Sequence, residues 1–126
     1  MQRDLDLVRE ILKACEAESH GYAPHPLLIE GYSRDQIGFH VYLMIDAGLL
    51  EGGPVTNTSS QSPEGMAQSM TWAGYEFLEA SRNNEIWGKA KKAAKATGGM
   101  TLEALKGILT ALATEAAKKF LGLPPS

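Results

Sequence analysis

The side chains that could perform chemistry are few and widely separated. Three histidines are present, and neither the pair His20 and His25 nor His40 belongs to an HExxH pattern. No carboxylate cluster completes a facial metal triad with them. The single Cys15 excludes an intrachain disulfide and a cysteine-based zinc site, and it falls on an apolar helix face where a buried thiol is expected. We therefore expect no catalytic residue, no metal ion, no cofactor and no enzymatic activity.

The clearest structural signal is the segment YSRDQIGFHVYLMIDAGLL, residues 32–50. Ser33 and Gln36 have the spacing of a capping box, in which each side chain satisfies a backbone donor at the helix start. Apolar or small residues then recur at intervals of four, three and four, namely Ile37, Val41, Met44 and Gly48. The pattern predicts a central helix that ends at Gly48 in a left-handed C-cap and runs directly into a strand.

Weaker patterns flank this helix on both sides. A helix is predicted from Asp4 to Glu18, a short strand at Leu27–Glu30, and a pair of strands joined by a polar loop. The strands of that pair are Leu49–Val55, with a bulge or bend at Gly52-Gly53-Pro54, and Ala67–Thr71, and the loop is Asn57–Gly65. Thr71 is predicted to cap a helix that continues through Leu78. Only about fourteen residues separate the first helix from the central one, so a helix-turn-helix here would be truncated.

Residues 81–126 differ from the rest of the chain. One predicted helix contains the basic stretch KAKKAAK, Gly98-Gly99 interrupts it, and a final helix begins at Thr101. An apolar seam with spacings of three and four follows, formed by Leu102, Leu105, Leu109 and Leu112. Two interpretations remain open, because the seam either packs on the chain's own domain or forms a homodimer interface.

These elements predict an α+β fold that is mostly helical. A winged-helix-like domain is expected over residues 1–80, followed by two C-terminal helices in residues 81–126 that pack on it or form a dimer interface. Hydrophobic content of 44% without a run of about 18 apolar residues predicts a soluble protein without a membrane span. The N-terminal segment MQRDLDLVREILK lacks the apolar stretch of a signal peptide, so we expect a cytoplasmic location.

Charge is distributed unevenly between these two regions. Residues 1–80 contain four Lys/Arg and twelve Asp/Glu, whereas residues 81–126 contain eight and three. A protein that reads duplex DNA should present a basic surface, because phosphate contacts supply much of the affinity. The candidate basic patch lies instead in the C-terminal region, at Arg82, Lys89, Lys91, Lys92 and Lys95. We expect weak, non-specific nucleic-acid binding there, or a solvated face that serves solubility alone.

The outward face of the central helix is predicted to carry Arg34, Phe39 and Tyr42. Reading of bases favours Arg, Lys, Asn and Gln, whereas exposed aromatic residues with an arginine are typical of protein interfaces. These three residues are therefore the candidate partner-binding site. The alternative is that the C-terminal helices cover Phe39 and Tyr42.

Four segments carry a resemblance to a known family. MQRDLDLVREILKACE, EGYSRDQIGFHVYLMIDAGLLEG, MTWAGYEFLEASRNNEIWGKAKK and the GG-x-TLEALK start of the last helix resemble the family catalogued as domain of unknown function 2513. The resemblance implies a winged-helix-like fold in small bacterial proteins that are often encoded in prophages. AGLLEG and MTWAGYEFL are also similar to winged-helix repressors of the arsenic-repressor type, although Gly38 and Phe39 stand where those carry Ser and Arg.

Two functions of different class follow from these observations. The first is a non-enzymatic binding module of phage or prophage type that binds a host or phage protein in the bacterial cytoplasm. The second is a DNA-binding transcriptional regulator whose wing and basic C-terminal region contact phosphates. The charge distribution favours the first.

Overall fold

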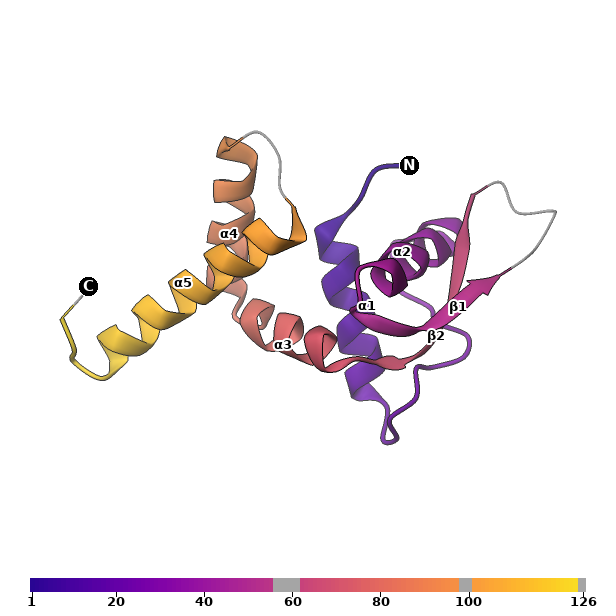
Figure 1. Ribbon diagram of the computed structural model, residues 1–126, viewed down its shortest axis with the longest axis horizontal. Helices are drawn as coiled ribbons and strands as arrows, with labels where there is room; N and C mark the ends of the chain where they lie inside the picture. The colour runs from indigo at the N-terminus through magenta and orange to yellow at the C-terminus, as the bar shows by residue number, and fades with distance from the viewer. Residues whose placement is uncertain (56–61, 98–100, 125–126) are drawn as a thin grey trace. The chain divides into compact units, whose positions relative to one another are not determined.

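The computed structural model describes residues 1–55, 62–97 and 101–124, and it divides into two compact units, Met1–Leu78 and Glu79–Ser126 (Figure 1). Its elements are α1 (Leu5–Ala17), α2 (Arg34–Asp46), β1 (Leu50–Val55), β2 (Glu64–Met70), α3 (Trp72–Ser81), α4 (Asn84–Ala96) and α5 (Leu102–Phe120). The predicted α+β, mostly helical fold class is confirmed. Most of the predicted loop Asn57–Gly65, and the break at Gly98-Gly99, lie outside the described residues.

Helix α1 forms because its first turn is capped and one face is apolar. The Asp4 carboxylate accepts hydrogen bonds from the backbone N–H groups of Asp6 (2.9 Å) and Leu7 (3.2 Å). The face that points into the N-terminal unit is buried and consists of Leu7, Val8, Ile11, Leu12 and Cys15. The chain then continues to α2 without a further helix in residues 18–33.

Helix α2 begins and ends as the sequence predicts. The Ser33 hydroxyl accepts from the Gln36 N–H (3.1 Å), and the Gln36 side chain accepts from the Ser33 N–H (2.8 Å), which completes the capping box. At the other end Gly48 has φ of +81°, and its N–H donates to Ile45, while the next N–H donates to Met44. These two bonds form a Schellman motif, so Gly48 is the left-handed cap.

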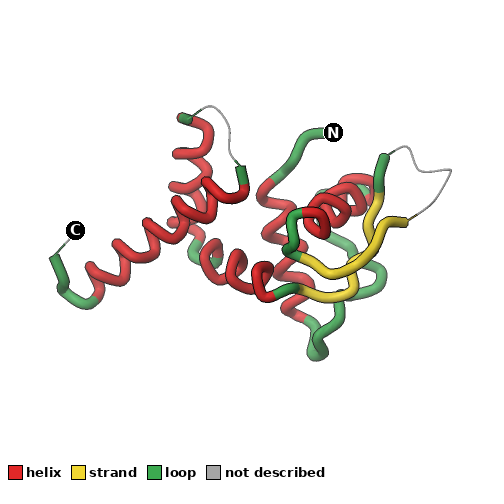
Figure 2. Tube along the Cα trace, in the orientation of Figure 1, coloured by secondary structure: helices red, strands yellow, loops and turns green. Residues whose placement is uncertain are grey.

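Strands β1 and β2 form an antiparallel hairpin (Figure 2). The pairing register shifts between Glu51 and Gly52, which confirms the bulge predicted near the glycine pair. Thr71 joins the hairpin to both neighbouring helices. Its hydroxyl donates to the Gly48 carbonyl (2.6 Å) and accepts from the Gly74 N–H (3.0 Å) at the start of α3. The predicted helix cap at Thr71 is therefore confirmed.

The short strand predicted at Leu27–Glu30 is wrong, because these residues form no strand. The position beside β2 is taken by an earlier segment, in which Tyr22 forms a bridge with Ser69 and the Ala23 N–H donates to the Gln68 carbonyl (2.8 Å). The segment that joins the sheet is chosen by pairing with residues more than forty positions away in the sequence. A local sequence pattern does not encode this choice. Leu28 is 74% exposed, so the predicted segment has no buried face to hold it against the sheet.

The C-terminal unit contains the helix pair α4 and α5, which pack on each other. The Asn83 side chain caps α4 by accepting from the N–H groups of Glu85 and Ile86, and the Thr101 hydroxyl caps α5 by accepting from the N–H of Ala104. The buried apolar residues of the pair are Trp87, Ala90, Ala94, Leu105 and Leu109.

Candidate functional site

Helix α2 and strand β2 approach each other so closely that a side chain would not fit between them. A Cβ atom added to Gly65 would lie 2.7 Å from the Tyr42 backbone nitrogen and 2.8 Å from its Cα. On the helix side, a Cβ on Gly38 would meet Glu64 Cγ at 3.0 Å. The two glycines therefore bring the hairpin onto α2, and this contact defines one side of a groove.

The α2–hairpin groove, as we name it, has a volume of about 430 Å³ and lies within the N-terminal unit. Three elements line it. They are the 24–28 loop, the first half of α2 and the distal ends of both strands. The lining residues are Pro24, His25, Pro26, Leu27, Leu28, Arg34, Ile37, Gly38, Val41, Val55, Glu64, Gly65, Met66 and Ala67.

Large apolar side chains stand exposed among these lining residues. Leu28 on the loop is 74% exposed and Met66 on β2 is 58% exposed. A single exposed apolar residue needs no explanation, but two that line one groove mark a candidate interaction surface. The groove also contains His25, Arg34 and Glu64, so its charged groups are few.

The predicted partner-binding residues are only partly brought together. Arg34 is exposed and lines the α2–hairpin groove, whereas Phe39 and Tyr42 do not line it. The Phe39 ring is half-buried and meets the His40 ring edge-on, with 5.9 Å between centroids. Tyr42 is 39% exposed. The outward face of α2 thus exposes Arg34 and Tyr42, and Phe39 is half-buried.

His40 forms hydrogen bonds that no sequence pattern predicts. Its ring is buried, its Nε2 accepts the Asp4 backbone N–H (2.8 Å), and its Nδ1–H donates to the Gln36 carbonyl (2.7 Å). The Tyr32 hydroxyl also donates to the Asp4 carboxylate (3.2 Å), and burial, reinforced by that carboxylate, raises the pKa of Tyr32. Asp4, which caps α1, is therefore hydrogen-bonded both to Tyr32, just before α2, and to His40, within α2.

The residues missed by the sequence reasoning are the apolar ones on the loop and the strand. The sequence predicts Leu28 to lie in a strand, and Met66 falls between the predicted loop Asn57–Gly65 and the predicted strand Ala67–Thr71. The sequence offers one indication that Leu28 and Met66 are exposed. Neither belongs to a periodic apolar pattern, so neither has a predicted partner in the core.

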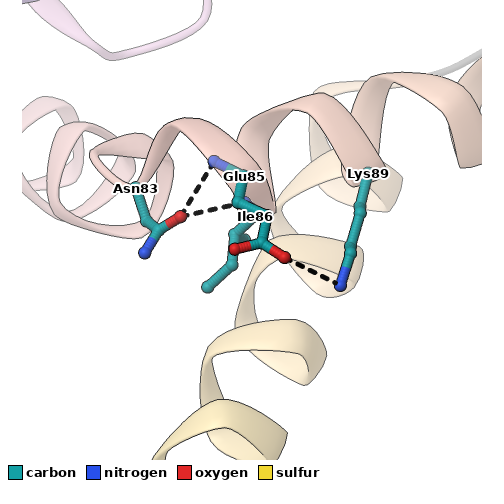
Figure 3. Close-up of polar contacts among 4 residues, drawn as sticks. All are labelled: Asn83, Glu85, Ile86 and Lys89. Atoms are coloured by element: carbon teal, nitrogen blue, oxygen red, sulfur yellow. Dashed lines mark hydrogen bonds and ion pairs between the residues drawn. The ribbon is translucent and has the colours of Figure 1, made fainter.

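Three of the five residues of the predicted basic patch are engaged with neighbouring side chains in the C-terminal unit. Lys89 lies 3.5 Å from Glu85 on the preceding turn of α4, beside the Asn83 cap (Figure 3). Arg82 pairs with Glu79 at 2.6 Å, and the Lys91 ammonium lies 5.8 Å from the Trp87 ring centroid. Lys92 and Lys95 are exposed. Two lysines on one helix are a small footprint for phosphate binding.

The apolar seam of α5 is divided by its surroundings. Leu105 and Leu109 are fully buried within the chain, while Leu102 and Leu112 are half-buried. Because the two central leucines are already covered, this arrangement favours the interpretation in which the first part of the seam is internal core.

The described residues contain no grouping of three His, Cys, Asp or Glu side chains that could hold a metal ion. Cys15 is buried on α1, and burial, assisted by the charge of Glu18, raises the pKa of its thiol from 9.0 to about 11. A thiol in this state is a poor nucleophile at neutral pH, because the thiolate is the reactive form.

The described helices are too short or too polar to cross a membrane. Over residues 1–55, 62–97 and 101–124, none combines the length and the apolar character that a bilayer span requires.

Comparison with known proteins gives two matches that agree. The family model described as "Hypothetical protein (DUF2513)" matches residues 2–101. An uncharacterized protein of Haemophilus influenzae is 30% identical over 112 residues, which cover 86% of this chain and 92% of the relative. No solved structure shows a significant match. The chain therefore belongs to the family described as hypothetical protein (DUF2513).

Proposed function

We propose that this protein is a non-enzymatic, winged-helix-like binding module that binds a host or phage protein through the α2–hairpin groove. The order of elements in the N-terminal unit supports the winged-helix assignment, since α2, β1, β2 and α3 follow one another as recognition helix, wing and closing helix. The Tyr22–Ser69 bridge stands where the first strand of such a domain would pair. The phage or prophage setting and the bacterial cytoplasm come from the family resemblance.

The exposure of Leu28 on the loop and Met66 on β2, both of which line the groove, is the observation that carries the proposal. Covering a large apolar side chain contributes about 1.5–3 kcal/mol when it moves fully from water to an apolar surrounding. A partner segment that lies in the groove would cover both side chains at once. The groove therefore suits an apolar segment of a protein.

The charges around the groove indicate what else the segment should carry. Arg34 is exposed at the start of α2, lines the groove together with Glu64, and belongs to none of the ion pairs found among the described residues. A carboxylate next to the apolar residues of the partner would pair with it, and guanidinium–carboxylate pairs combine charge with geometric specificity.

Charge also argues against a nucleic acid as the occupant of this groove. The first eighty residues carry twelve acidic and four basic side chains, which would repel phosphates. The basic residues lie in the other unit, where Arg82 and Lys89 are paired with glutamates. Any nucleic-acid binding by Lys92 and Lys95 should be weak, sensitive to salt and without sequence preference.

The proposal is tested by quantitative affinity capture from a bacterial host lysate. The bait carrying both Leu28→Asp and Met66→Asp is compared with wild type, and Trp72→Ser serves as the matched control. Trp72 is 79% exposed on α3 and does not line the groove, so its loss leaves the groove intact. We expect a protein that wild type and the control retain and the double variant loses.

A mobility-shift assay on the DNA upstream of the protein's own gene is run beside the capture. The proposal predicts at most weak binding that disappears near physiological salt. Sequence-selective binding that persists there and is lost in Tyr42→Ala, together with a captured set of proteins that the double variant does not change, would replace the proposal with the regulator.

A further inference from the structure

An apolar stripe runs along one face of α5, and it is buried in the first half of the helix but becomes exposed in the second half. Along one face of the helix, Leu105 and Leu109 are fully buried, Leu112 is half-buried, and Ala116 and Phe120 are exposed, Phe120 by 90%. Spacings of three and four keep these residues on one side of the helix. A stripe of this kind normally faces a partner along its whole length.

The two helices of the unit differ in length, and the stripe is exposed along the second half of the longer one. Helix α4 has 13 residues and α5 has 19, and α5 runs on past α4 toward the C-terminus (Figure 1). The turn that follows adds two further exposed apolar side chains, Leu121 (66%) and Leu123 (53%).

A second groove lies beside this exposed stretch, wholly within the C-terminal unit. Its volume is about 400 Å³, and it is formed by the first turns of α4 and the second half of α5. Its apolar lining is Ile86, Leu112, Ala116 and Leu123. Figure 3 shows Ile86 next to the Glu85–Lys89 ion pair, so this apolar lining residue has a negative and a positive charge beside it.

We infer that this surface binds a second copy of the chain, with Phe120 of each protomer inserted into the α4–α5 groove of the other. One surface supplies both an exposed apolar side chain and an apolar groove, which is the requirement of an isologous, two-fold interface. The mixed charges of the rim fit a copy of the same surface better than they fit a uniformly charged partner.

Charge complementarity along α5 sets the direction of the pairing. If two α5 helices pack antiparallel about a two-fold axis near Ala117, Glu115 of one protomer lies opposite the partner's Lys119, and the reciprocal pair forms on the other side. A parallel arrangement would place like charges opposite each other, which is unfavourable. The described residues show neither side chain in an ion pair within the chain.

Of the four seam leucines Leu102, Leu105, Leu109 and Leu112, only Leu112 belongs to this interface, which extends further toward the C-terminus. It also does not rest on the α2–hairpin groove, which lies in the other unit. If the protein proves to be a monomer, the proposed function still stands. If the α2–hairpin groove captures no protein, the dimer inference still stands.

Sedimentation velocity of the full chain, from low micromolar to several hundred micromolar protein, tests the inference. Wild type should pass from monomer to dimer over this range, and Phe120→Asp should raise the dimer Kd by roughly 10-fold or more. Trp72→Asp, an equally drastic change of an exposed aromatic residue that lies in the other unit and lines neither groove, should leave the Kd unchanged. Far-UV circular dichroism confirms that each variant keeps its helices.

A charge-exchange pair makes the test independent of Phe120. Glu115→Lys alone should weaken the dimer, and adding Lys119→Glu should restore it, because the pairs are then exchanged across the axis. Wild type that stays monomeric at the highest concentration, a Phe120→Asp variant that dimerises as tightly as wild type, or a double charge variant no tighter than Glu115→Lys alone would overturn the inference.

Discussion

In the N-terminal unit, polar contacts tie together residues that are far apart in sequence, whereas the caps and ion pairs of α4 and α5 join near neighbours. The bond between Asp4 and His40 spans 36 residues, and the bond between Thr71 and Gly48 spans 23. In the C-terminal unit, the Asn83 cap and the Glu85–Lys89 pair span four residues or fewer. Contacts between residues distant in sequence thus hold the first unit together, whereas the polar contacts of the second unit mainly stabilise each helix by itself.

The apolar cores differ in the same direction. Among the described residues, fourteen buried apolar side chains belong to the N-terminal unit and five to the C-terminal one. A small core gives a small margin of stability, and helices that cannot cover their apolar faces tend to acquire a partner. The smaller core of the C-terminal unit accords with the apolar side chains that the second half of α5 leaves exposed.

The largest expected effect comes from removing a core leucine from each unit in turn. Leu12 and Leu109 are both fully buried, and Leu12→Ala should lower the free energy of unfolding by about 2–5 kcal/mol. In urea unfolding of a Trp72→Phe background, where Trp87 is the single tryptophan, Leu109→Ala should shift the transition seen by fluorescence, and Leu12→Ala the remaining transition seen by circular dichroism. One transition, shifted equally by both variants, would show that the units do not differ.

The thiol of Cys15 tests how tightly the N-terminal unit is closed. A pKa of about 11 in place of 9.0 leaves about 100-fold less thiolate at pH 8, so alkylation by iodoacetamide should be at least that much slower in the folded protein than in urea. Because the folded pKa is the higher one, this thiol's contribution to stability is full below pH 9 and is lost as the pH rises toward about 11. Equal alkylation rates in both states would mean that α1 opens readily.

The close contact between β2 and α2 predicts a smaller but specific effect. Gly65→Ala places a Cβ against the Tyr42 backbone at 2.7 Å, and the required shift should cost about 1–3 kcal/mol of stability. Gly21→Ala is the control, because no atom lies within 4 Å of its added Cβ. Thermal unfolding of both variants checks this, and similar midpoints would show that the groove wall adapts to a side chain.

The smallest expected effect separates two threonine caps. Thr71→Ala and Thr101→Ala each remove a side-chain cap, which costs about 0.5–2 kcal/mol. Thr71 also donates to the Gly48 carbonyl, so its loss should fall at the upper end of that range and Thr101 at the lower end. Urea midpoints measure the difference, and a larger effect at Thr101 would reverse the comparison.

The sequence predicted those elements that local chemistry encodes. Helix α2 begins at a capping box and ends at a glycine with φ of +81°, and both signals lie within a few residues of the structure they produce. The strand assigned to Leu27–Glu30 failed for the opposite reason, because the segment that pairs with β2 is chosen by a contact between Tyr22 and Ser69. Position in the sheet is a long-range property.

The candidate site was harder to predict than the fold. Arg34 lines the groove as part of a predicted helix face, but Leu28 and Met66 come from a loop and a strand whose meeting depends on how the hairpin packs on α2. That packing depends in turn on the absence of a side chain at Gly65. The sequence shows where a glycine stands, but only the structure shows what approaches it.

Photocrosslinking from inside the α2–hairpin groove tests the proposed protein-binding role most directly. A benzophenone amino acid replaces Leu28 in one protein and Trp72 in another, and each is irradiated in host lysate before the adducts are identified by mass spectrometry. Both positions are largely exposed, but only Leu28 lines the groove. The account predicts a discrete protein adduct from position 28 that position 72 does not give. Identical adducts from both positions, or no protein adduct from position 28, would contradict it.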